Sequence, residues 1–293
     1  RGAGEVGGCG LSLRREDEIL ELFHYTNPAG LAGIANSKAL WATKIQFLND
    51  SSELNHGFEV LSRVSKKIAP DYDRNIGSLL KGIEQAADRM LSINIFVVCF
   101  CEEHDLLSQW RGYGGEGGLS VGFDRETLKN QAYRNGFELR RCIYDEREKM
   151  RVTRDFLEEK ISSIREHNQN HSSLELVASF LKTAATFKDA SFREEKEWRL
   201  ISQPISIRDE RLFVSAGVRM LIPRINFSLK TGLMPLKTDS QPSRTVEDIG
   251  VRSVIVGPNS EQVLMRDAVE GLFTAADAYI KSVGRSCAPF RSL

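Results

Sequence analysis

Residues 95–101 read Ile-Phe-Val-Val-Cys-Phe-Cys, and this run decides which kind of fold the chain can adopt. The run is rich in β-branched and aromatic side chains, which is typical of a buried strand. Helical periodicity precedes it, because apolar residues recur at 3–4-residue spacing over residues 54–68 and again over residues 76–91. Amphipathic helices followed by a buried strand predict a domain in which helices pack against a sheet.

Further strands and helices are expected on both sides of this run. Upstream, residues 20–25 form a short apolar run that ends at Asn27-Pro28, a helix-start signal, and residues 40–43 look extended. Downstream, residues 146–188 and 261–280 have helical character, whereas the Gly, Pro and Ser residues of 230–247 favour a loop or flap. The other strands are expected at residues 119–123, 139–144, 198–202, 218–222 and 253–257.

These segments predict a single mixed α+β domain over residues 18–285, because no linker separates them. Residues 1–17 start without Met and are Gly-rich, so we expect a disordered or mis-assigned N-terminal tail there. Residues 286–293 are expected to form a short C-terminal tail.

The composition is that of an ordinary globular protein, and it does not indicate what the protein binds. The chain has 293 residues, of which 41% are hydrophobic, enough for a sizeable core. Its 40 Lys and Arg residues balance 40 Asp and Glu residues, so net charge favours neither a nucleic-acid nor a membrane partner. Five cysteines do not make a disulfide framework in a chain of this length, and no apolar run approaches the ~18 residues that span a bilayer. We therefore expect a cytoplasmic protein without a membrane partner.

Two motifs in the middle of the chain resemble ligand sites and favour structural interpretations. Gly112-x-Gly114-x-x-Gly117 matches a dinucleotide fingerprint, but a polar stretch precedes it and a strand follows, the reverse of the required strand-to-helix context. Cys99-x-Cys101-x-x-His104 could supply metal ligands, yet no fourth ligand is evident. The two cysteines alternate within an apolar strand, where small buried thiols are the usual outcome, so no metal is expected.

Polar residues at strand ends are more informative. His24 closes the first expected strand, and residues 49–53, which include Asp50 and Glu53, are explained as helix capping with a ligand role left open. Residues 108–114 place Ser, Gln, Trp, Arg and Tyr in a glycine-rich loop, and could equally be site or scaffold. The densest charge lies at residues 194–199, before and within a strand.

Strand alternation gives this charge run a possible chemical role. Glu195, Glu197 and Arg199 would point to one side and Trp198 to the other. If Trp198 lies in the core, the other three form a polar row, and two carboxylates beside an arginine can stabilise positive charge or act as a base. The same row could also be a buried structural ion network.

Taken in order, these motifs resemble the bacterial family of unknown function numbered 2971 (DUF2971). The resemblance covers residues 20–275, and the segments that carry it are His24-Tyr25-Thr26, Leu40-Trp41-Ala42-Thr43, Leu48-Asn49-Asp50-Ser51-Ser52-Glu53, Leu107-Ser108-Gln109-Trp110-Arg111-Gly112-Tyr113, Glu195-x-Glu197-Trp198-Arg199 and Ile255-Val256-Gly257-Pro258. This family is grouped by fold similarity with the ADP-ribosyltransferases. The resemblance implies a split, mostly antiparallel sheet around a central cleft that holds NAD, with flanking helices.

The resemblance also implies roles for individual residues. Glu197 would bind the nicotinamide ribose and Glu195 would assist the acceptor, as in a Glu-x-Glu pair. The residues implied to bind NAD are His24, Tyr25, Thr26, Ser108, Trp110, Arg111, Tyr113 and Arg199. Of these, Ser108, Trp110 and Tyr113 stand where the family pattern has an aromatic or Ser-Thr-Ser element, and they match it by position alone.

The activity implied is NAD-dependent mono-ADP-ribosyl transfer, or NAD hydrolysis, with a protein or nucleic-acid acceptor. Breaking the nicotinamide–ribose bond develops oxocarbenium character, which a nearby carboxylate stabilises without a metal. One alternative is a catalytically inactive nucleotide- or protein-binding domain of the same fold. Another is a nucleic-acid-directed transferase in bacterial toxicity or antiphage defence.

Overall fold

The computed structural model of the protein describes residues 20–48, 53–90, 93–115, 117–167, 171–206, 208–217, 220–238 and 241–289. It contains two β-sheets that meet at strands β1 and β3. The first sheet has the order β1-β4-β11-β12 and the second the order β5-β6-β3-β2-β8-β7. All neighbouring strands in these sheets are antiparallel except β11 and β12. Their bounds are β1 Glu21–Thr26, β2 Ala39–Lys44, β3 Phe96–Phe100, β4 Leu119–Asp124, β5 Phe137–Arg141, β6 Trp198–Ser202, β7 Leu212–Ala216, β8 Leu221–Ser228, β11 Val251–Val256 and β12 Ser282–Arg285.

The junction between the sheets is a short backbone pairing. Phe23 in β1 and Cys101, directly after β3, exchange two N–H···O bonds of 2.8 Å. The two sheets therefore form a split, mostly antiparallel arrangement, and the fold is α+β as expected from the sequence.

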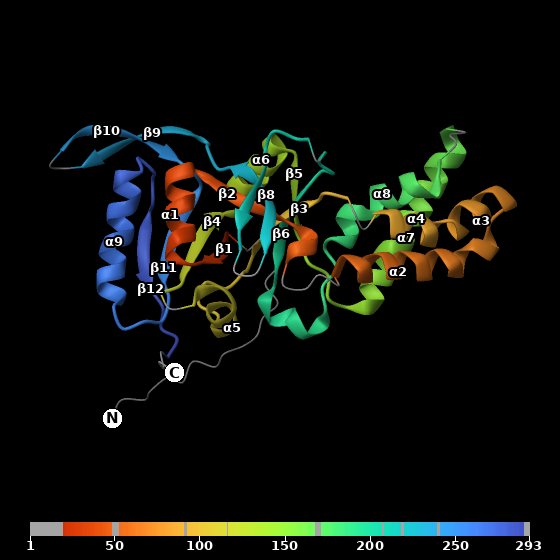
Figure 1. The fold of residues 1–293 in the computed structure, drawn as a ribbon, viewed down its shortest axis with the longest axis horizontal. Helices are drawn as coiled ribbons and strands as arrows, with labels where there is room; N and C mark the ends of the chain where they lie inside the picture. The colour runs from red at the N-terminus through yellow and green to blue at the C-terminus, as the bar shows by residue number, and fades with distance from the viewer. Residues whose placement is uncertain are drawn as a thin grey trace, which may run out of the picture.

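Helices pack around the sheets in two groups (Figure 1). Helices α1 and α9 lie beside the four-stranded sheet, whereas α2, α3, α4, α7 and α8 form a helical lobe at the other end of the molecule. The helix bounds are α1 Pro28–Ser37, α2 Glu53–Ile68, α3 Arg74–Lys81, α4 Ile83–Met90, α5 Leu107–Gln109, α6 Arg125–Asn135, α7 Glu146–His167, α8 Ser173–Ala184 and α9 Gln262–Ala275. No helix in the described ranges is long and apolar enough to span a bilayer.

Two hydrophobic cores follow this division. One core contains Trp198 and Leu200 of β6 and joins side chains of both sheets with α1 and α9. The other fills the helical lobe and includes Val97 and Ile201. The six-stranded sheet therefore contributes opposite faces of the same strands to the two cores, so β3 and β6 are buried on both sides.

Local sequence signals explain several element ends. The Asn27 side chain accepts from the Gly30 N–H at 2.8 Å and caps α1, whose first residue is Pro28. The expected helix over residues 76–91 is instead two helices, α3 and α4, separated at Gly82. A Cβ on Gly82 would lie 2.4 Å from Ser173 Oγ, so glycine at this position permits the close approach of the start of α8.

The expected loop at residues 230–247 is wrong, because this segment forms the hairpin of β9 (Gly232–Thr238) and β10 (Gln241–Asp248). Pro235 and Pro242 led to the loop prediction, but a two-stranded ribbon consists only of edge strands, which tolerate proline. Helix α6 was not expected, although Asp124 caps it by accepting from Thr127 N at 2.7 Å.

The chain segment after β12 is held against the junction. Ser286 Oγ donates to Asp105 Oδ1 at 2.5 Å, and the Cys287 N–H donates to Asp105 Oδ2 at 2.8 Å. The N-terminal tail expected at residues 1–17 lies outside the described residues.

Candidate functional site

A pocket of about 50 Å³ lies at the junction of the two sheets. Strands β1 and β3 supply one part of its wall, and the segments that contain α5 and the start of β6 supply the rest. The residues that line the pocket are Phe23, His24, Tyr25, Cys99, Phe100, Cys101, Gln109, Tyr113, Glu195 and Glu197.

His24 is held in one tautomer by its neighbour across the junction. Its Nδ1 lies 2.9 Å from the Cys99 carbonyl oxygen, which can only accept, so Nδ1 carries the proton and Nε2 keeps its lone pair in the neutral ring. Burial lowers the pKa of His24, and the positive charge of Arg224 lowers it further against the effect of the Cys99 bond. His24 is therefore a neutral side chain at pH 7, suited to accept a hydrogen bond at Nε2.

Tyr25 lines the pocket next to His24, and Trp110 packs against Tyr25 without lining the pocket. The Tyr25 hydroxyl donates to the Glu103 carbonyl at 2.8 Å and accepts from the Leu106 N–H at 2.9 Å. Trp110 packs against the Tyr25 ring at a centroid distance of 4.7 Å, and its Nε1 donates to Asp105 Oδ1 at 2.7 Å. These contacts fix the α5 segment against β1.

Tyr113 lies in a π-helical turn, Trp110–Gly114, that directly follows α5. Its side chain lines the pocket, yet Tyr113 remains 44% exposed, so it stands at the rim. Partial burial, together with the nearby Cys99 and Glu195, raises the pKa of Tyr113 to about 12. The phenol is therefore neutral at physiological pH and can present a ring face or a hydroxyl to a ligand.

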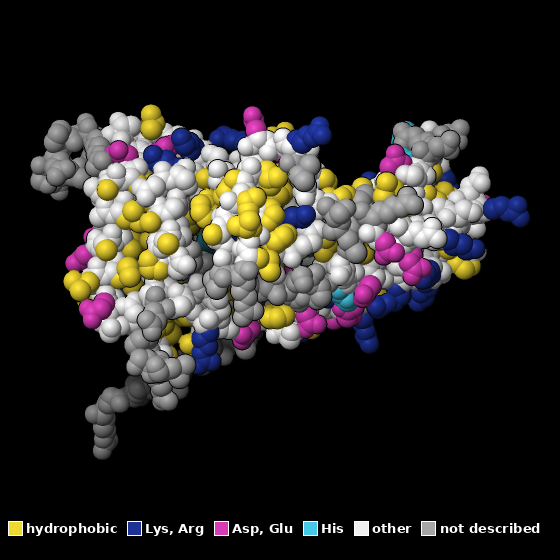
Figure 2. Space-filling view, viewed as in Figure 1, with side chains coloured by type: hydrophobic (Ala, Val, Ile, Leu, Met, Phe, Trp, Pro, Cys, Tyr) yellow, Lys and Arg dark blue, Asp and Glu magenta, His cyan; other side chains and the backbone are white. Residues whose placement is uncertain are grey.

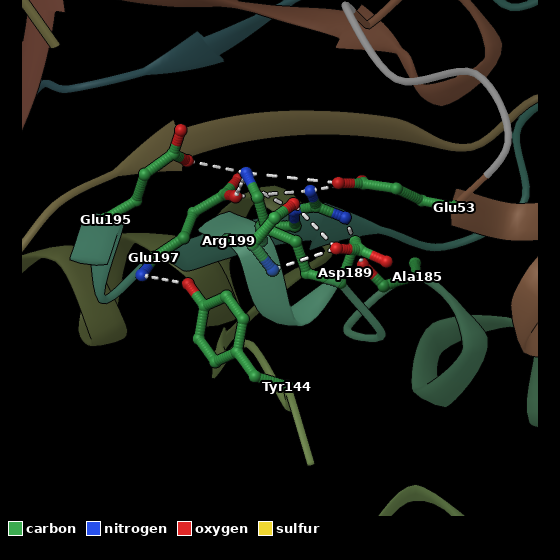
Figure 3. A network of polar contacts seen from close by, with 9 residues as sticks. Glu53, Tyr144, Ala185, Asp189, Glu195, Glu197 and Arg199 are labelled. Atoms are coloured by element: carbon green, nitrogen blue, oxygen red, sulfur yellow. Dashed lines mark hydrogen bonds and ion pairs between the residues drawn. The ribbon is translucent and has the colours of Figure 1, made fainter. Parts of the chain in front are cut away.

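The carboxylates of the site belong to a buried ion network (Figure 3). Glu197 accepts from Arg199 Nε at 2.8 Å and from Lys188 Nζ, while Glu195 accepts from Lys188 Nζ at 2.6 Å. Arg199 NH2 also donates to Glu53 Oε2 at 2.5 Å. Three carboxylates thus face two cations, and the network carries an excess of negative charge when all groups are ionised.

The surroundings of Glu53 and Glu197 shift the pKa values of the two carboxyl groups in opposite directions. Burial by itself would raise the pKa of Glu197, but Arg199 and Lys188 outweigh it and lower the pKa to about 2. Burial raises the pKa of Glu53, and the negative charge of Glu197 adds to this effect while Arg199 opposes it. Of these two carboxylates, Glu53 therefore takes up a proton more readily, whereas Glu197 stays ionised at neutral pH.

Glu195 and Glu197 differ in access to the pocket. The Glu197 side chain is 5% exposed and binds both cations, whereas the Glu195 side chain is 13% exposed and accepts from Lys188. Glu195 ends a 3-10 turn, Ala190–Glu195, and Lys196 follows in the left-handed region at φ 42°. The expected extended row therefore starts only at Glu197, although Lys188 still brings both carboxylates together.

The structure brings some of the predicted site residues together and separates others. His24, Tyr25, Tyr113, Glu195 and Glu197 line one pocket. The predicted residues that do not line it are Thr26, Ser108, Trp110, Arg111 and Arg199. Arg199 is 1% exposed and has its guanidinium bound to Glu53, Glu197 and the Ala185 carbonyl, so it lies behind the pocket.

Sequence reasoning missed two members of the network. Lys188 was assigned to the end of a helical stretch, and nothing in its local sequence marks it as a partner of two glutamates. Glu53 was assigned to capping, but its carboxylate binds Arg199; the Asp50 half of that expected capping pair lies outside the described residues. Cys99 was expected to be a buried thiol, and burial followed by the charge of Glu197 raises its pKa well above the usual range.

Comparison with known families supports the resemblance seen in the sequence. Residues 109–200 match the family described as a protein of unknown function, DUF2971. The match supports the predicted resemblance over residues 109–200, and this segment contains Tyr113, Glu195 and Glu197 of the pocket. No curated protein and no solved structure matches the chain.

Proposed function

We propose that this chain cleaves the bond between nicotinamide and ribose in NAD, and transfers ADP-ribose to an acceptor or to water, at the pocket between β1 and β3. The observation that carries the proposal is that side chains from distant parts of the chain meet in one pocket. His24, Tyr113 and the pair Glu195–Glu197 come from three distant chain segments and line one small pocket. The two mostly antiparallel sheets also agree with the split sheet that the family resemblance implies.

The proposed reaction fits the charges around the pocket. As the ribose C1′–N bond breaks, its electron pair leaves with nicotinamide, which becomes neutral, and positive charge develops on the ribose. Glu195 would stabilise that charge, because it is the more accessible carboxylate. The incoming water or acceptor hydroxyl then bonds to C1′ and releases its proton to Glu195.

The other residues would position the reacting groups. Glu197 stays ionised and binds Lys188, so it would hold the cation that orients Glu195. The free Nε2 of His24 would accept a hydrogen bond from a ribose hydroxyl. Tyr113 at the rim offers a ring on which nicotinamide could stack.

The size of the pocket limits what it can enclose. A volume of about 50 Å³ is far below the roughly 300–1,000 Å³ that is typical of ligand sites. Only part of NAD would enter the pocket in this conformation, and the rest would extend over the neighbouring surface. Deeper entry would require the α5 segment and the turn at Trp110–Gly114 to move.

The test is nicotinamide release from NAD by the purified protein, with and without cell lysate. Glu195→Gln and Glu197→Gln keep side-chain size and remove charge, so we expect release to fall by about a hundredfold or more. Glu194→Gln is the matched control, because Glu194 is an exposed neighbouring carboxylate and does not line the pocket. Stimulation by lysate would indicate transfer, and nuclease sensitivity of that stimulation would indicate a nucleic-acid acceptor.

A second candidate is a catalytically inactive nucleotide- or protein-binding domain. The small pocket and the two cations bound to Glu197 favour it, since an ion network of this kind can be purely structural. This candidate predicts no nicotinamide release from folded protein under either condition, and no effect of Glu195→Gln on ligand binding.

A further inference from the structure

Arg224 lies on the six-stranded sheet near the pocket, and among the described residues its guanidinium has no carboxylate partner. The guanidinium of Arg224 in β8 lies 5.4 Å from the centre of the Trp41 ring in β2. Its Nε donates to Ser215 Oγ at 2.8 Å and its NH1 donates to Thr43 Oγ1 at 3.2 Å. Within the described ranges Arg224 forms no ion pair, and its NH2 group has no acceptor.

These contacts fix the orientation of Arg224, and none of them comes from a carboxylate. Burial lowers its pKa, which reflects the cost of removing a guanidinium from water without a counter-ion. A planar guanidinium that is stacked on an aromatic ring and held by two hydroxyls loses little further freedom when it binds an anion. Phosphate oxygens match the remaining N–H donors.

An aromatic surface surrounds this arginine. Trp41 is 47% exposed, and Phe213 in β7 contacts it edge-on at a centroid distance of 5.5 Å. Figure 2 shows apolar side chains gathered on the surface over the region where Figure 1 places β2 and β8. An exposed indole beside an unpaired guanidinium can stack a nucleobase while the arginine binds a phosphate.

The sheet connects this surface to the pocket. Arg224 pairs with Thr43, and Thr43 pairs with Val97 of β3, so the three side chains share one face of the sheet. Cys99 lies two residues further along β3 on that same face and lines the pocket. The charge of Arg224 also lowers the pKa of His24, which indicates that the two groups are near each other.

We propose that Arg224 and Trp41 bind the pyrophosphate and the adenine of a dinucleotide whose other end enters the His24 pocket. This inference rests on the proposed function, because it assigns a place to the part of NAD that the pocket cannot enclose. It also makes a separate claim about binding, since ADP-ribose has the pyrophosphate and adenine but no bond to cleave.

The experiment measures equilibrium binding of ADP-ribose and of inorganic pyrophosphate to the full chain by calorimetry. We expect Arg224→Gln to weaken ADP-ribose binding by about ten- to hundredfold, the usual effect of losing hydrogen bonds to a charged group. Trp41→Ala should weaken ADP-ribose binding more than pyrophosphate binding, because it removes the adenine stack as well as one of the contacts that orient Arg224. Arg211→Gln is the control for charge, since Arg211 is exposed and paired with Asp209; it should not change either affinity.

The possible outcomes separate this inference from the proposed function. Equal ADP-ribose affinity in wild type and Arg224→Gln, or no binding by folded wild type, overturns the inference even if NAD is cleaved. Binding that depends on Arg224 supports the inference even if no nicotinamide is released, in which case the proposed reaction fails. Binding of single-stranded oligonucleotides more tightly than ADP-ribose, again dependent on Arg224, would assign the surface to nucleic acid and overturn the dinucleotide.

Discussion

Arg199 NH2 donates to Glu53 Oε2 over 2.5 Å, although the two residues are 146 positions apart in the chain. Arg199 lies within β6 of the six-stranded sheet, and Glu53 is the first residue of α2 in the helical lobe. Both side chains are nearly inaccessible to solvent. This contact therefore joins the lobe to the strand that leads from the candidate site.

Removal of Arg199 should destabilise the protein strongly. Arg199→Met leaves Glu53 and Glu197 buried with one cation between them, so we expect a loss of about 3–5 kcal/mol in the free energy of unfolding. Urea denaturation measures this loss, and Arg211→Gln on the surface should cost less than about 1 kcal/mol. In the double variant with Glu53→Gln, the two effects should be less than additive, because both remove the same contact. Full additivity would contradict the ion pair.

Acid should remove the contribution of Glu197 over a defined pH range. The pKa of Glu197 is lowered from 4.5 to about 2 in the folded protein, so its stabilising effect is fully present above pH 4.5 and is lost as pH falls towards 2. The shift corresponds to about 3 kcal/mol for this buried group. The stability gap between wild type and Glu197→Gln, measured by urea denaturation, should therefore shrink between pH 5 and pH 2. A gap that stays constant over that range would show that Glu197 is not held ionised by its neighbours.

His24 should titrate below the usual histidine range. Burial lowers its pKa from 6.5, so neutral His24 stabilises the folded state above pH 6.5 and this contribution is lost as pH falls below that value. NMR titration of the histidine ring signals, assigned by comparison with His24→Gln, measures the pKa directly. The nitrogen shifts should report a neutral ring protonated at Nδ1, because that atom donates to the Cys99 carbonyl. An Nε2-protonated ring would refute the proposed acceptor role of Nε2.

The sequence predicted the parts of the site that depend on local pattern. Trp198 lies in the core as the alternation required, and Glu197 and Arg199 lie together on the other face of β6. His24 was expected to close its strand, but β1 continues to Thr26, so His24 lines the pocket from within the strand. Each of these predictions uses only strand periodicity and element ends, which short stretches of sequence carry.

The site residues that the sequence did not predict depend on contacts between distant segments of the chain. Lys188 reaches Glu195 and Glu197 only because η5, Ala190–Glu195, folds back before β6, and Glu53 reaches Arg199 only because the helical lobe docks on the sheet. No local pattern encodes either approach. Arg224 was missed for the same reason, since its significance comes from Trp41 and Thr43 on the neighbouring strand.

The glycine-rich segment before β4 contains a close backbone contact that positions part of the pocket wall. A Cβ on Gly118 would lie 2.4 Å from the Gly114 Cα, which is backbone and cannot move aside as a flexible side chain could. Gly118 also accepts a hydrogen bond of 2.8 Å from the Gly257 N–H, which places the turn at Trp110–Gly114 against the end of β11. Gly114 and Gly118 therefore permit a close backbone approach, which is a structural role for this part of the glycine-rich segment.

Gly118→Ala should push this turn away from the sheet and move Tyr113 at the pocket rim. We expect a loss of about 1–3 kcal/mol in the free energy of unfolding, typical of overpacking, together with faster hydrogen exchange at the Gly257 amide. Gly112→Ala is the matched control, because it lies in the same turn and a Cβ there meets no atom within 4 Å. Equal stability and equal exchange in the two variants would mean that the close approach at Gly118 does not position the wall, and Tyr113 would then need another explanation for its place at the pocket.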